Sequence, residues 1–174
     1  MKEDAMHAFG YRHPRRAAAI ALLGSAVVLG GACSSSTAPA PHAEIARQLA
    51  EARERWRATG LDTYGFTMRR SCFCPPPHRV SLIVREGRLS HVADLETGEG
   101  VPPESMAFYR DVEGLFDMVA QAVERDAARL EVTFDPQMGY PSSVSIDFRF
   151  EVADDEWSAE VLSPPAELLE GGGA

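Results

Sequence analysis

The sequence contains almost no lysine, few cysteines and no apolar run of membrane-spanning length. Lys2 is its only lysine, and 26 Asp and Glu outnumber 17 Lys and Arg over 174 residues, which gives a formal net charge of −9. An acidic surface repels the phosphates of nucleic acid and the headgroups of anionic lipids. We therefore expect no nucleic-acid partner, and attachment to a membrane would need another source of affinity.

Catalytic signatures are also missing. The chain has no Gly-x-Ser-x-Gly elbow, no His-Glu-x-x-His pair and no glycine loop that would hold a phosphate. The stretch "FDPQMGYP" offers Asp135 and Tyr140 as candidate catalytic residues, but its prolines and glycine are typical of a turn. The acidic clusters at 94–99 and 154–156 lack the ligand spacing of a calcium loop. No pattern therefore favours an enzyme, and none indicates a cofactor.

The N-terminal segment is organised like an export signal. Arg12, Arg15 and Arg16 precede the apolar run "AAAIALLGSAVVLGGA", which leads to Cys33. This run is shorter than the roughly 20 residues that a transmembrane helix requires. "LGGAC" resembles the lipobox of bacterial lipoproteins, whose cysteine is lipidated and becomes the mature N-terminus. We predict a signal peptide over residues 1–32, then a lipidated Cys33 and a flexible tether over residues 33–41. The alternative is ordinary signal cleavage that leaves Cys33 as a thiol.

The motif "CFC" contains the two other cysteines, Cys72 and Cys74. If lipid occupies Cys33, these two remain as a pair in an oxidising compartment, which favours a disulfide. A regular strand would hold their Cβ atoms about 6.5 to 7 Å apart, whereas a disulfide needs about 3.5 to 4.5 Å. The bond therefore requires a bend at Phe73, which the three prolines that follow make plausible.

Three other interpretations of this motif stay open, of which the simplest is a pair of free thiols. Cys72, Cys74 and His78 are suitable ligands for zinc or copper(I), with His91 as a fourth. A disulfide in so small a ring could instead take part in thiol exchange, although the usual Cys-x-x-Cys at a helix start is absent.

The remaining pattern predicts one α+β domain over residues 42–163 and a loose tail over 164–174. Helical periodicity is visible before Gly60 and again after Asp111, which we expect to cap the second helix. Three strands should follow each helix, and "SVSIDFRFEV" alternates through Phe148 and Phe150. The order helix, three strands, helix, three strands favours an antiparallel sheet of about six strands with the helices packed on one face.

The chain resembles a family of small bacterial secreted proteins and lipoproteins that is defined only as a domain of unknown function. The resemblance covers about residues 45–162 and rests on Trp56 and the segments "TYGF", "CFC", "VREGRL", "VEGLF", "FDPQMGYP" and "ADDE". It implies an extracytoplasmic α+β domain and adds no mechanism.

These observations give one main hypothesis and one rival. The main hypothesis is an exported lipoprotein of the bacterial cell envelope that faces the periplasm or the exterior. Lipid on Cys33 would hold it to the membrane, and its domain would bind a protein or small molecule without catalysis. The rival is a thiol-redox or metal-handling envelope protein that uses Cys72 and Cys74.

Overall fold

The computed structural model describes residues 41–152 and 154–168, so the predicted signal peptide, Cys33 and most of the tether lie outside the described residues. The elements follow one another along the chain as α1 (Ala43–Ala58), β1 (Tyr64–Cys72), β2 (Arg79–Arg85), β3 (Arg88–Asp94), the 3-10 helix η1 (Pro103–Phe108), α2 (Val112–Glu124), β4 (Arg129–Phe134), β5 (Pro141–Asp147) and β6 (Glu156–Glu167).

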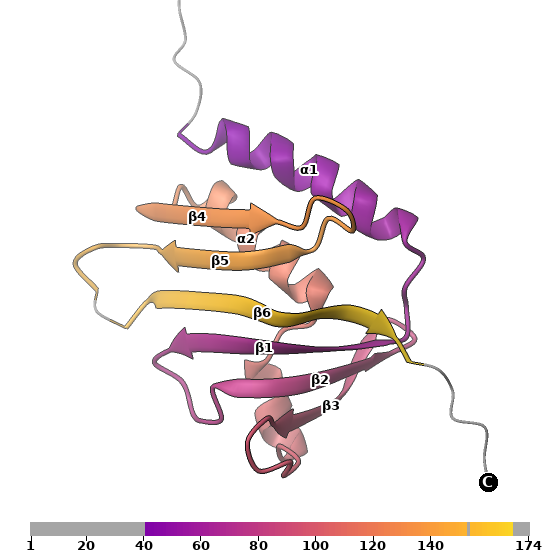
Figure 1. The fold of residues 1–174 in the computed structure, drawn as a ribbon. Helices are drawn as coiled ribbons and strands as arrows, with labels where there is room; N and C mark the ends of the chain where they lie inside the picture. The colour runs from indigo at the N-terminus through magenta and orange to yellow at the C-terminus, as the bar shows by residue number, and fades with distance from the viewer. Residues whose placement is uncertain (1–40, 153, 169–174) are drawn as a thin grey trace, which may run out of the picture. The chain divides into compact units, whose positions relative to one another are not determined.

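The six strands form one antiparallel sheet in the order β3-β2-β1-β6-β5-β4 (Figure 1). The predicted α+β class and six-stranded antiparallel sheet are confirmed. The arrangement differs from the predicted one in that η1 is inserted before α2. The two groups of three strands meet at β1 and β6, so the first and last strands lie side by side at the centre of the sheet.

One face of the sheet packs against the helices. In β1 the side chains of Tyr64, Phe66 and Met68 are buried, while those between them are not, as expected for a strand with one covered face. The helix α2 packs against β4 and β5, and α1 packs against α2 and β4. Figure 1 shows α2 behind the sheet and α1 alongside β4.

The start of α2 is fixed by its cap and by a tyrosine from the sheet. The Asp111 carboxylate accepts a hydrogen bond from Gly114 N at 2.8 Å, and the Tyr64 hydroxyl accepts one from Val112 N at 3.3 Å. Two N–H groups that the helix itself cannot pair are satisfied in this way. No helix among the described residues is long and apolar enough to cross a bilayer.

Two expectations about the strands were wrong. The strand predicted to run through Phe150 ends at Asp147, because the Asp147 carboxylate accepts a bond from Arg149 N at 3.0 Å and turns the chain. As a result Phe150 is 69% exposed. The last strand continues to Glu167, four residues into the segment predicted to be loose.

The strand β6 extends past residue 163 although it contains two prolines, because its pairing with β1 is irregular there. Pro164 and Pro165 fall where the pairing with β1 shifts register, between the Thr67–Ser163 and Gly65–Ala166 pairs. A β-bulge tolerates the missing N–H groups of proline. Beyond Glu160, β6 no longer pairs with β5, so one of its sides needs no donors there.

The turn between β4 and β5 lies against α1 through a glycine. Gly139 has a φ of +86°, and a Cβ atom built on it would lie 2.2 Å from the Ala52 carbonyl oxygen. Gly98 also has a positive φ, of +75°, but nothing lies within 4 Å of its Cβ position. The two glycines therefore share a backbone constraint and differ in their surroundings.

We predict that Gly139→Ala lowers the free energy of unfolding much more than Gly98→Ala does. Left-handed backbone alone costs an alanine about 1 to 2 kcal/mol, which is the loss expected for Gly98→Ala. Gly139→Ala should lose about 3 to 5 kcal/mol, because the turn must also move away from α1. Urea unfolding measures both values, and equal losses would show that the contact with α1 is unimportant.

Candidate functional site

The cysteine motif forms a sharp bend at the end of β1. Cys72 and Cys74 are joined by a disulfide in this structure, and their Cα atoms lie 5.2 Å apart. Cys74 N donates a hydrogen bond to the Cys72 carbonyl at 2.9 Å, so the chain turns at Phe73 as the disulfide requires. Phe73 itself is 89% exposed. The motif therefore holds an aromatic side chain out in solvent at the tip of a closed ring.

A buried arginine holds the loop that follows. Arg70 is only 2% exposed and points to the helix side of the sheet. Its Nη2 donates to the Pro75 carbonyl at 2.5 Å, and its Nε and Nη2 both lie 3.3 Å from the Pro77 carbonyl oxygen. Its backbone N–H also donates to the His78 carbonyl at 2.8 Å. The proline loop is thus wrapped around one guanidinium group.

The same guanidinium also binds the segment that leads into α2. Arg70 Nη1 donates to the Phe108 carbonyl at 2.9 Å, and its Cζ lies 3.9 Å from the centre of the Tyr109 ring. The Tyr109 hydroxyl donates to the Pro77 carbonyl at 3.1 Å. Two loops that are distant in the sequence are therefore joined through Arg70 and Tyr109.

Arg70 forms no ion pair with any carboxylate among the described residues. Burial lowers the pKa of its guanidinium, and burial raises the pKa of the Tyr109 hydroxyl. An arginine side chain nevertheless stays protonated in proteins. The buried charge is therefore stabilised by carbonyl dipoles and by the face of an aromatic ring.

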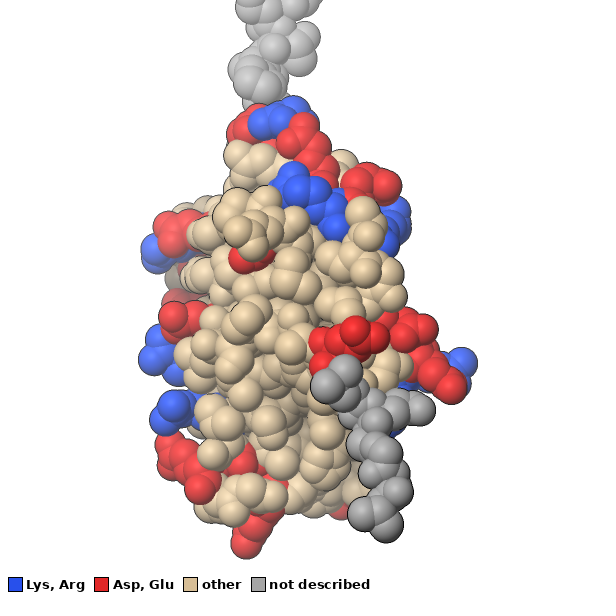
Figure 2. All heavy atoms as spheres, turned by 45° about the vertical axis from the view of Figure 1, so that its right-hand side comes forward, with Lys and Arg blue, Asp and Glu red and all other residues tan. Residues whose placement is uncertain are grey.

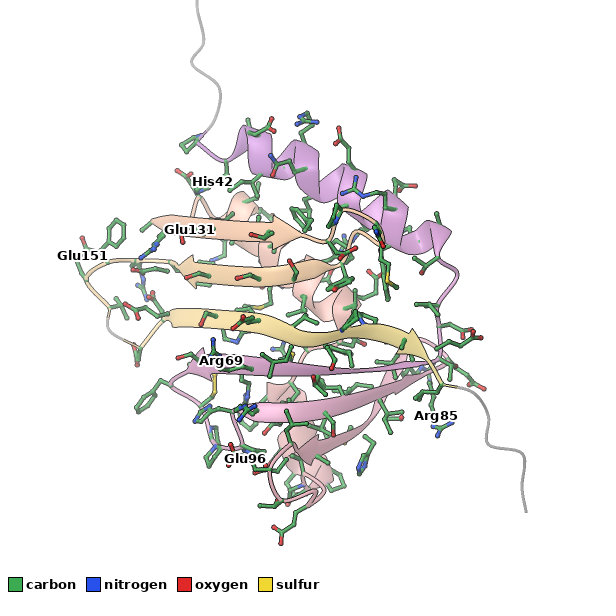
Figure 3. The ribbon with its side chains drawn as sticks, viewed as in Figure 1. His42, Arg69, Arg85, Glu96, Glu131 and Glu151 are labelled. Carbon is green, nitrogen blue, oxygen red and sulfur yellow. A yellow bond between two sulfur atoms is a disulfide. The ribbon has the colours of Figure 1, made fainter. Side chains whose placement is uncertain are left out.

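The other face of the sheet is open, and its side chains line up in rows across the strands. Three rows follow from the register of β4, β5, β6 and β1: Arg129, Asp147 and Glu156; then Glu131, Ser145, Ser158 and Ser71; then Thr133, Ser143, Glu160 and Arg69. The middle row contains three serines between two rows that carry charges. Figure 3 shows its β4 end at Glu131, and Arg69 on the far side of β5 and β6.

The small serine side chains create a depression that we call the serine groove, centred on Ser71, Ser145 and Ser158. Two adjoining hollows, of about 310 and 260 Å³, share these three residues. Phe73 lines the larger hollow, together with Asp147 and Glu156. The groove is therefore a polar hollow with an exposed aromatic ring beside it. Elsewhere on the surface, Figure 2 shows a broad uncharged area with charged side chains gathered at its margins.

The hydroxyl groups of the groove are free to bind. The hydroxyls of Ser142 on β5 and Ser163 on β6, which lie outside the two hollows, take part in hydrogen bonds within the protein. Within residues 41–152 and 154–168, no such bond involves the hydroxyls of Ser71, Ser145 and Ser158. Each hydroxyl can donate one hydrogen bond and accept others.

The candidate metal ligands are not brought together. Cys72 and Cys74 are occupied by their disulfide, and His78 and His91 are exposed. No group of three His, Cys, Asp or Glu that could hold a metal ion occurs among the described residues. This arrangement gives no support to the metal interpretation of the motif.

The other candidates have local structural roles. Asp135 accepts hydrogen bonds from Gln137 N and Met138 N at 2.9 and 2.6 Å, so it organises a turn. Burial and the nearby Asp135 carboxylate raise the pKa of Tyr140. In the acidic clusters, the Asp94 carboxylate accepts hydrogen bonds from Glu96 N and Thr97 N within a turn, and Asp155 forms an ion pair with Arg149.

Sequence reasoning missed Arg70 and the serine groove. Alternation along β1 places position 70 on the same face as Tyr64, Phe66 and Met68, and this is the signal from which its burial could have been predicted. The groove depends on the pairing of β1 with β6 and of β6 with β5. A sequence gives no direct signal for strand pairings over such separations.

Comparison with known proteins identifies a family. Residues 48–163 match the model of a family described as "Family of unknown function (DUF6174)". The match covers most of the chain, which therefore belongs to this family, as its resemblance to a domain of unknown function had indicated. No curated protein and no solved structure matches the chain. The matched region extends from α1 into β6 and contains both Arg70 and the serine groove.

We predict that Arg70→Met lowers the free energy of unfolding by about 3 kcal/mol, because it removes charge-assisted hydrogen bonds and leaves partly buried carbonyls unpaired. The matched control is Arg69→Met, which removes an exposed arginine paired with Glu160 and should cost less than about 1 kcal/mol. Urea unfolding measures both losses.

Amide hydrogen exchange measured on the same variants separates a local role from a general one. Arg70→Met should speed exchange in both 73–79 and 102–109, since Arg70 holds the two loops together. Acceleration in one loop alone, or the same pattern in Arg69→Met, would contradict this role for Arg70.

Proposed function

We propose that this member of the DUF6174 family is a bacterial cell-envelope lipoprotein whose domain is a non-catalytic binding module, with the serine groove as its binding surface. The groove is the observation that carries the proposal. Its three hydroxyls have no hydrogen-bond partners among the described residues, and an exposed phenylalanine stands beside them. Sites that bind ligands commonly combine a hollow, a few converging polar groups and an aromatic surface.

The surroundings of the serines favour binding over catalysis. A serine nucleophile needs a neighbouring general base to take its proton. Among the described residues that line the two hollows there is no histidine and no lysine, and no groove hydroxyl is hydrogen-bonded to a carboxylate. The groove therefore offers hydrogen bonds without an activated nucleophile.

The proposed location rests on the sequence before the domain. Basic residues, an apolar run and "LGGAC" precede Cys33, and the lipid on that cysteine would anchor the domain. A bacterial lipoprotein carries several acyl chains, which together hold a protein stably at a membrane. Residues 34–41 would give the domain the reach to meet a protein or small-molecule partner in the envelope.

A second candidate function is thiol exchange at the cystine. One observation favours it: Arg70 Nη1 lies 4.0 Å from Cys72 Sγ. A guanidinium beside a sulfur stabilises the thiolate that forms when the disulfide is reduced. The same guanidinium is fully used in holding the two loops, so we rank this function second.

The binding proposal predicts site-specific crosslinking in cells. The full-length chain would be expressed with p-benzoylphenylalanine in place of Phe73, an exposed aromatic residue beside the groove, or in place of Ser81, which lies on β2 outside it. Irradiation should give a discrete crosslinked product from position 73 and none from position 81. Adding Ser145→Trp should abolish the product, because the indole fills the groove.

Two control variants separate the parts of this proposal. Cys33→Ser should move the chain from the membrane to the soluble fraction and lower the yield of the crosslink. Cys74→Ser would accumulate a mixed disulfide with a partner if thiol exchange were the function. Crosslinking that is equal at positions 73 and 81, or that survives Ser145→Trp, would rule out the groove as the binding surface.

A further inference from the structure

Two carboxylates face each other at one wall of the serine groove. Asp147 on β5 and Glu156 on β6 are directly paired across the strands, and both line the larger hollow. Like charges placed opposite each other on a sheet destabilise it. This pair is therefore a cost to the fold unless something positive binds between the two carboxylates.

The nearby arginines are already paired with other carboxylates. Arg129 donates to Glu131 at 2.9 and 3.1 Å, although it stands directly across from Asp147. Arg149 lies 3.1 Å from Asp155. In the part of the chain that the structure describes, no ion pair includes Asp147 or Glu156. Arg129 also lines the larger hollow, but its guanidinium is bound to Glu131, so Asp147 and Glu156 are the two carboxylates there without an ion pair among the described residues.

Asp147 is the stronger sign of a ligand because it is buried. It is only 9% exposed, and one of its carboxylate oxygens accepts a bond from Arg149 N. Its second oxygen has no hydrogen-bond partner among the described residues and is still reached by solvent. Its position at the hollow lets a bound positive group pair with this oxygen at short range.

Phe73 gives the groove an aromatic face for the same kind of group. It lines the hollow that contains Asp147 and Glu156, and the disulfide limits the freedom of its backbone. Within this chain, arginine already stacks on aromatic rings, at 3.9 Å for Arg70 on Tyr109 and 4.0 Å for Arg125 on Phe148. A cation over a ring gains electrostatic attraction.

We propose that the serine groove binds an arginine side chain presented by a protein partner. Its guanidinium would lie between the carboxylates of Asp147 and Glu156, near the ring of Phe73. The peptide backbone beside it would hydrogen-bond to the serine hydroxyls. A guanidinium fits better than an ammonium because it is planar, donates in pairs and stacks on rings. This inference rests on the proposed function and names the chemistry of the partner.

The test is calorimetric titration of the full-length chain in mild detergent with the peptide acetyl-Gly-Arg-Gly-Arg-Gly-amide. The same peptide with citrulline in place of arginine has nearly the same shape without the charge. We expect the citrulline peptide to bind at least about tenfold more weakly, because a charge paired in a half-buried site is worth more than about 1.4 kcal/mol.

Matched variants locate the binding site. Glu156→Gln and Asp147→Asn should each weaken binding of the arginine peptide about tenfold, and asparagine still offers an oxygen to Arg149 N. Glu151→Gln is the control: Glu151 lies in the β5–β6 loop beyond the strand ends (Figure 3), so this change should alter affinity less than about twofold. Phe73→Ala should weaken binding of the arginine peptide and lower the selectivity for arginine over citrulline by about two- to fivefold, because the ring attracts only the charged group.

Several results would overturn the inference. Equal binding of the arginine and citrulline peptides would show that the groove does not recognise a positive charge. Equal effects of Glu151→Gln and Glu156→Gln would show only general attraction to an acidic protein. Binding of a tetramer of N-acetylglucosamine that Asp147→Asn does not weaken would assign the groove to glycans. If no peptide binds while the crosslink from position 73 persists, the arginine inference fails and the binding proposal stands; if the crosslink is also absent, both fail.

Discussion

The buried guanidinium of Arg70 is the interaction on which this end of the molecule depends. It replaces a hydrophobic side chain on the covered face of β1 and satisfies carbonyls from two separate loops. Because Tyr109 stacks on the guanidinium and also binds Pro77, the loop after β1 and the segment before α2 are held as one unit. The start of α2, capped by Asp111 and bound to Tyr64, follows directly from that segment.

This constraint links the covered face of the sheet to the open one. Arg70 lies on the helix side, whereas its neighbours Arg69 and Ser71 belong to the rows that border and floor the serine groove. Holding the proline loop at Arg70 also fixes the bend at Cys72 and Cys74, and so places Phe73 at the larger hollow. The arrangement of the groove at its β1 end therefore depends on a side chain buried beneath it.

Much of the fold was predictable because its signals are local. Alternation in β1, the positive-φ turn at Glu86 and Gly87, and the cap at Asp111 depend on residues close together in the sequence. The strand ends were harder. Asp147 ends β5 through a bond to the backbone that interrupts a continuing apolar pattern, and β6 passes through two prolines with the help of a bulge. In both places, backbone hydrogen bonds and strand pairing determine where the strand ends, although the order of apolar residues and prolines indicates a different end.

The candidate site was less predictable because it is assembled from strands distant in the sequence. Ser71 and Ser158 become neighbours only when β1 pairs with β6, and Asp147 meets Glu156 only when β5 pairs with β6. Nothing in the sequence near Arg70 identifies Phe108 as its acceptor. The cysteine motif could be analysed from the sequence because both thiols lie within three residues of each other.

The most direct measurement is nuclear magnetic resonance of the arginine side chains in the ¹⁵N-labelled protein at neutral pH. If Arg70 holds the two loops, its Nε and Nη protons should give separate signals that exchange slowly with water, because rotation of the guanidinium would break bonds to three carbonyls. Exposed Arg85 should give the averaged, rapidly exchanging signals of a free arginine. Averaged Arg70 signals that match those of Arg85 would contradict the account.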